Sequence, residues 1–63
     1  MKLKLLEDRP VQHINLVKYL RENKLGDFTK YQNNYDYWEY DVECDEEQLI
    51  IILLKFSSIR VIR

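Results

Sequence analysis

The sequence predicts an α+β domain in which one amphipathic helix packs on a small, mostly antiparallel sheet, in the order strand, helix, strand, strand, short strand. Two periodic segments indicate this class. Residues 11–24 repeat apolar side chains at helical spacing, and residues 35–44 alternate apolar and polar side chains as a strand does. The 63 residues are expected to form a single domain, residues 1–63, because so short a chain cannot fill two cores.

The first strand is predicted by alternation at the start of the chain. Met1, Leu3 and Leu5 are expected to face the core, and Lys2 and Lys4 to face water. Two outward lysines are typical of a strand at the edge of a sheet.

A helix is predicted from Val11 to Lys24. Asp8 and Pro10 are typical of residues that precede and open a helix, and Gly26 is typical of a helix stop. At about 100° per residue, one arc collects the apolar side chains Val11, Ile14, Leu16, Val17 and Leu20. Residues 27–34 are less clear, because Phe28 and Tyr31 fit either a loop or a short strand, and Asn33 and Asn34 indicate a turn.

The best strand candidate runs from Tyr35 to Cys44, where aromatic and β-branched residues are frequent. One parity is expected to be buried: Trp38, Tyr40, Val42 and Cys44. The other is expected to face water: Tyr35, Tyr37, Glu39, Asp41 and Glu43.

The apolar run at residues 49–54 has two interpretations. Three consecutive isoleucines favour a strand buried on both faces, because β-branching restricts helical rotamers. A buried helix remains open, because Asp45 and Gln48 have the spacing of a capping box. A last short strand is expected after a turn at Ser57 and Ser58.

A strand that is apolar on both faces would leave one face uncovered, because a single helix covers only one side of a sheet. Exposed patches of this kind usually mark an interface. We therefore expect a homodimer or an obligate complex. The predicted interface residues are Leu49, Ile50, Ile51, Ile52, Leu53 and Leu54.

The net charge of −1 conceals a strong asymmetry along the chain. Residues 31–54 carry seven acidic and no basic residues, whereas both flanking segments are basic. Alternate side chains on a strand are about 6.8 Å apart, close to the spacing of every second phosphate along a duplex, at about 3.4 Å per nucleotide. The sequence thus suggests a docking surface for a basic, nucleic-acid-binding groove, although outward acids are also ordinary solubilising residues. The predicted partner-binding residues are Tyr35, Tyr37, Glu39, Asp41, Glu43, Asp45, Glu46 and Glu47.

The segment Tyr35-Asp36-Tyr37-Trp38-Glu39-Tyr40 resembles the aromatic and acidic strands of small phage-encoded inhibitors of host nucleic-acid enzymes. These include the uracil-DNA glycosylase inhibitors and several anti-CRISPR (anti-defence) proteins. The resemblance covers these six residues, and the element order differs from that of the glycosylase inhibitors, so no inhibitory residue is transferred. It implies a DNA mimic, a decoy that occupies a DNA-binding surface.

Catalytic, metal and cofactor chemistry is not indicated. His13 and Cys44 are the only residues of their types and are each expected to be structural, so we predict no enzyme, no metal site and no cofactor. A single cysteine favours a reducing interior, hence the cytoplasm, and the longest apolar run is far short of a membrane span. A pI near 5.7 argues against direct nucleic-acid binding.

Two functional hypotheses follow. The first is a non-catalytic protein-binding module, an inhibitor or decoy that presents its acidic tyrosine strand to a basic surface of a partner such as a nucleic-acid-processing enzyme. The second is a small dimeric regulatory or antitoxin-like subunit that contacts nucleic acid through its basic face.

Overall fold

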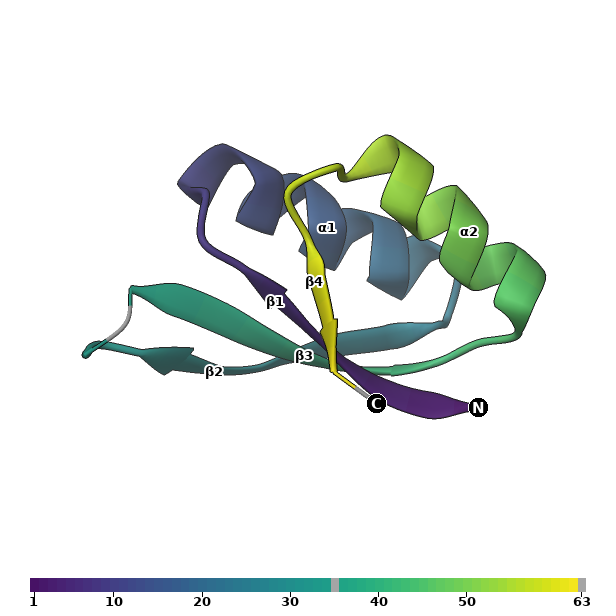
Figure 1. The fold of residues 1–63 in the computed structure, drawn as a ribbon, viewed down its shortest axis with the longest axis horizontal. Helices are drawn as coiled ribbons and strands as arrows, with labels where there is room; N and C mark the ends of the chain where they lie inside the picture. The colour runs from purple at the N-terminus through teal and green to yellow at the C-terminus, as the bar shows by residue number, and fades with distance from the viewer. Residues whose placement is uncertain (35, 63) are drawn as a thin grey trace.

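The computed structural model describes residues 1–34 and 36–62 and has an α+β fold, which confirms the predicted class (Figure 1). The elements follow one another as β1 (Lys2–Glu7), α1 (Pro10–Glu22), β2 (Gly26–Gln32), β3 (Tyr37–Glu43), α2 (Glu46–Lys55) and β4 (Arg60–Ile62).

The four strands form one antiparallel sheet in the order β2-β3-β1-β4. Both helices lie on the same side of it (Figure 1). This combination of element order and strand order is the split βαβ, or ferredoxin-like, topology. One face of the sheet is therefore covered by two helices, and the opposite face is open. A topology of this kind supports many functions and by itself indicates none.

The expected strand at residues 49–54 is wrong, because these residues lie within α2. Asp45 accepts a hydrogen bond from the backbone N–H of Gln48 at 2.7 Å, and the Gln48 side chain accepts one from the N–H of Asp45 at 3.0 Å. This capping box satisfies two donors at the start of the helix. The helix propensities of isoleucine and alanine differ by only a few tenths of a kcal/mol per residue, so capping and packing outweigh β-branching.

The core lies between the helices and the covered face of the sheet. Leu3 and Leu5 are buried as predicted, whereas Met1 is 44% exposed. The buried side chains are Leu3, Leu5, Leu16, Leu20, Leu25, Tyr40, Val42, Cys44, Leu49, Ile52, Phe56 and Ile59. The arc predicted for α1 is only partly correct, because Val11 and Ile14 are exposed on the side of the helix away from Leu16 and Leu20.

Gly26 begins β2 and does not end α1. The helix ends at Glu22, and Lys24 adopts the left-handed conformation that turns the chain, with φ of 55°. A Cβ atom on Gly26 would lie 2.1 Å from the carbonyl oxygen of Asp41. Glycine is therefore needed here for the close approach of β2 to β3.

Candidate protein-binding surfaces

The acidic side chains of β3 face the open side of the sheet, but basic residues of the neighbouring strand lie next to them on that same side. In the register of β1 and β3, Lys2 is paired with Glu43 and Lys4 with Asp41. Directly paired residues of neighbouring strands project from the same face, so opposite charges adjoin there. The base-free stretch of sequence is thus not a base-free surface.

Glu39 is the clearest departure from the predicted docking surface, because it is buried, with 8% of its surface exposed. Its Oε2 lies 3.8 Å from Nζ of Lys4 and 3.7 Å from Nζ of Lys30, which reach it from the strands on either side. Its Oε1 accepts a long hydrogen bond from the Tyr37 hydroxyl at 3.4 Å. Glu39 is therefore part of a three-strand ion cluster and is not available to a partner.

The remaining acids of the predicted set do not continue as one row. Asp41 and Glu43 are exposed on the sheet, whereas Glu46 and Glu47 are exposed at the start of α2, in the helical layer. Asp45 is exposed, and its carboxylate caps α2. Tyr37 is half-buried, and Tyr35 lies outside the described residues.

The outer side of α2 carries four of the ten large apolar side chains that are exposed within the described part of the chain. Leu49 and Ile52, both predicted interface residues, are instead fully enclosed in the core. The other four of that set are exposed: Ile50 by 55%, Ile51 by 40%, Leu53 by 37% and Leu54 by 80%. The helix is thus apolar on all sides along its middle, a pattern typical of helices that are buried all round.

A hollow is also lined by residues of α1 and β2, and the sequence did not indicate it. Ile14, Val17 and Phe28 supply apolar lining, and Lys18 and Arg21 supply basic lining. Arg21 is already occupied, because its Nε donates to Oδ1 of Asp27 at 2.9 Å.

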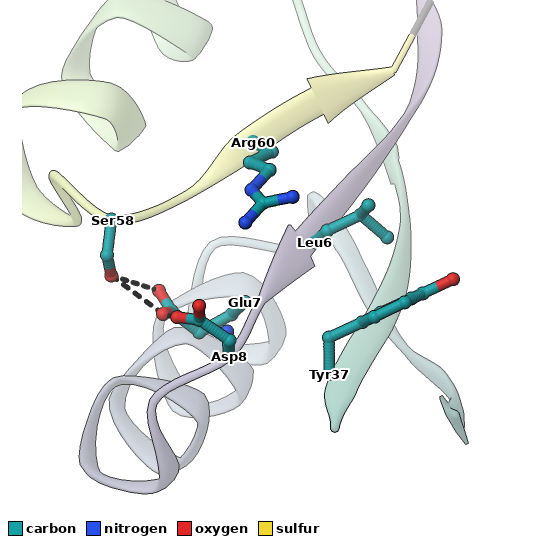
Figure 2. Close-up of a pocket in the computed structure, with 6 residues that line it drawn as sticks. All are labelled: Leu6, Glu7, Asp8, Tyr37, Ser58 and Arg60. Carbon is teal, nitrogen blue, oxygen red and sulfur yellow. Dashed lines mark hydrogen bonds between the residues drawn. The ribbon is translucent and has the colours of Figure 1, made fainter. Parts of the chain in front are cut away.

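A pocket of about 320 Å³ lies at the end of β1. Its lining residues, shown in Figure 2, are Leu6, Glu7, Asp8, Tyr37, Ser58 and Arg60. Glu7 is 1% exposed. Its Oε1 accepts from the backbone N–H groups of Asp8 and Arg9, both at 3.1 Å, and the Ser58 hydroxyl lies 2.7 and 2.8 Å from its two oxygens. The carboxylate thereby satisfies free donors ahead of α1, a structural role.

His13 lies in an aromatic cluster beside this carboxylate. Its ring stacks on Trp38 with centroids 4.4 Å apart, and its Nδ1 lies 2.6 Å from the Tyr40 hydroxyl. Burial lowers the pKa of His13, and the charge of Glu7 opposes this shift. Burial together with the Glu7 charge raises the pKa of Tyr40. His13 is thus a packed, neutral imidazole at neutral pH.

Cys44 is buried, and burial is the main cause that raises its pKa. A raised pKa leaves less of the reactive thiolate at neutral pH. Within residues 1–34 and 36–62, no group of three metal-ligating side chains comes together. Neither helix described there has the length and hydropathy of a transmembrane span.

Comparison with protein-family models, curated proteins and solved structures finds no match to this chain.

Proposed function

We propose that this domain is a non-catalytic protein-binding module and that its partner covers the outer face of α2. The observation that carries the proposal is the run of aliphatic residues 49–54, of which the core encloses only Leu49 and Ile52. The four others leave a continuous apolar surface on a helix of ten residues. Single exposed apolar residues are normal, whereas contiguous ones usually mark an interaction site.

Docking of the acidic strand to a basic partner, as an inhibitor would do, is a second hypothesis. The exposure of Asp41, Glu43 and Glu47 supports it. Lys2 and Lys4 weaken it, because they offset the negative charge on the same face. Nucleic-acid binding by a dimeric regulator stays a prediction of the sequence. It gains no support from Lys4 and Arg21, because these two basic residues already form ion pairs with Glu39 and Asp27.

Site-specific photo-crosslinking tests these alternatives in the cells that make the protein. A benzophenone amino acid is placed at Leu54 on the α2 face, at Glu43 on the sheet, or at Val11, a control position on α1 that is 73% exposed. We expect a covalent protein adduct from Leu54 and none from Val11. Adducts from Glu43 alone would favour the acidic strand, and the absence of any Leu54-specific adduct would refute the proposed function.

A further inference from the structure

We propose that the partner of the α2 face is a second copy of this chain, and that the two copies pair their α2 helices antiparallel about a two-fold axis. This inference rests on the proposed function and names the partner of the same surface. Two features of α2 support it, the spacing of its exposed residues and the placement of its charges, and the length of α2 sets the affinity that we expect.

The exposed residues of α2 have the spacing of a helix-packing stripe. One face of α2 is formed by Glu47 and by the residues three, four and seven positions after it, which are Ile50, Ile51 and Leu54. This face points away from the buried Leu49 and Ile52. Such a stripe fits into the grooves of another helix, and the same stripe on a second copy is available by symmetry.

The charges at the two ends of α2 select the orientation. Glu47 lies in the first turn and Lys55 in the last, and both are exposed. A parallel pair would place the two copies of Glu47 beside each other and the two copies of Lys55 beside each other, so like charges would adjoin. An antiparallel pair, crossing near Ile50 and Ile51, instead brings each Glu47 to the Leu54–Lys55 end of the other helix. The opposed helix dipoles favour the same arrangement.

Lys55 is already located at the margin of this stripe. Its Nζ lies 5.7 Å from the centre of the Tyr19 ring, on the flank of α2 that faces α1. Glu47 of a second helix can approach it there without displacing an ion pair, since no ion pair of Lys55 occurs within the described residues.

The length of α2 limits the affinity. Ten residues span about 15 Å, so the contact is smaller than the roughly 800 Å² per partner of a standard interface. We therefore expect a dimer with a dissociation constant in the micromolar range, at about 1–100 μM.

Sedimentation equilibrium of the purified full chain tests the identity of the partner, over concentrations from about 1 to about 500 μM that bracket this affinity. The mass should rise from 7.8 kDa toward twice that value. Ile50→Gln combined with Leu54→Gln should raise the dissociation constant at least about tenfold. The control, Val11→Gln with Ile14→Gln, alters two exposed apolar residues of α1 and should leave the dissociation constant unchanged. Circular dichroism should show that both variants are folded.

The orientation is tested by exchanging the charges. Glu47→Lys and Lys55→Glu should each weaken the dimer several-fold, and the double variant should recover most of the loss, because it restores opposite charges in an antiparallel pair. If the double variant lost as much dimerisation free energy as the two single variants lose together, the antiparallel arrangement would be wrong.

Two results would overturn self-association through α2: a wild-type chain that is monomeric at every concentration, or a dimer that is indifferent to Ile50→Gln with Leu54→Gln. Neither result decides the proposed function. If the Leu54 adduct had a mass other than twice that of the chain, its partner would be another protein, and a partner on α2 would still be supported. If Leu54 gave no adduct at all, both the proposed function and self-association through α2 would be refuted.

Discussion

At the scale of single residues, two buried carboxylates hold distant parts of the chain together. Glu7 accepts hydrogen bonds from the backbone ahead of α1 and from Ser58, which lies 51 positions away. Glu39 lies between Lys4 and Lys30. When one member of a buried charged group is removed, the charges and donors that it faced are left without a partner. Both carboxylates are therefore expected to contribute to stability.

Glu39→Lys should therefore destabilise the domain, because it places three ammonium groups at the centre of the open face. We expect the free energy of unfolding to fall by about 3 kcal/mol. Asp41→Lys is the control: it reverses an exposed charge on the same strand and should cost less than about 1 kcal/mol. Urea denaturation measures both. Equal effects of the two substitutions would show that Glu39 is an ordinary surface residue.

Stability should also depend on the protonation of His13. Burial lowers the pKa of His13 below its ordinary 6.5 in the folded state, so the unfolded chain binds a proton first as the pH falls. The free energy of unfolding should be constant well above pH 6.5, fall as the pH drops through 6.5, and level off once the folded imidazole is also protonated.

The variant His13→Gln lacks this titration and is the control for other groups. Urea denaturation in steps between about pH 7.5 and about pH 5, above the ordinary range of carboxylates, gives the comparison. An NMR titration of His13 should give a folded-state pKa below 6.5. A value above 6.5 would contradict the assignment of a neutral, packed imidazole.

At the scale of elements, α2 combines two roles in ten residues. Its inner side, through Leu49, Ile52 and the following Phe56, closes the core. Its outer side contributes little to the fold and is the surface that we assign to binding. The helical phase decides which residues belong to which side, so neighbouring residues of the same type differ in burial: Ile52 is buried and Ile51 is exposed.

Substitutions along α2 should separate these two roles. Ile52→Ala creates a cavity in the core and should cost about 2–5 kcal/mol of unfolding free energy. Ile51→Ala removes an adjacent, 40% exposed side chain and should cost less than about 1 kcal/mol. Thermal or urea denaturation of the two variants gives the test. If Ile51→Ala were as costly as Ile52→Ala, the helical phase described here would be wrong.

The start of α2 depends on its capping box. Asp45→Ala removes the acceptor for the N–H of Gln48 and should reduce the unfolding free energy by about 1 kcal/mol. Asp45→Asn retains an acceptor oxygen and should recover most of the loss. An Asp45→Ala variant as stable as the wild type would show that packing alone maintains the helix.

At the scale of the whole molecule, the strand order places β1 and β3 in the interior of the sheet and β2 and β4 at its edges. The segment nearest the N-terminus is thus central, because both β3 and β4 pair with it. Parts of the sheet with partners on both sides are expected to open least often.

Native-state hydrogen exchange should reflect this order. Amides of β1 and β3 should exchange most slowly, and those of the three-residue β4 and of the outer edge of β2 should exchange fastest among the strands. The comparison of paired and edge amides within β2 serves as an internal control. Slowest exchange in β4 would contradict the topology.

The sequence by itself determined the features that depend on neighbouring residues. Alternation predicted β1 and β3, helical periodicity predicted α1, and the spacing of Asp45 and Gln48 contained the signal for α2. That signal competed with the β-branching of three isoleucines, a local preference worth too little to decide the outcome. The α+β class was therefore predictable although the number of helices was not.

Only the tertiary structure decided which residues meet across the sheet and which side of α2 remains uncovered. The acids of β3 have no basic residue between them along the strand, yet Lys4 of β1 and Lys30 of β2 flank Glu39 from the strands on either side. Likewise, nothing in the run Ile50-Ile51-Ile52 distinguishes the one enclosed isoleucine from its exposed neighbours. Strand register and helical phase relative to the core are set by the packing of the whole chain, and both candidate binding surfaces depend on them.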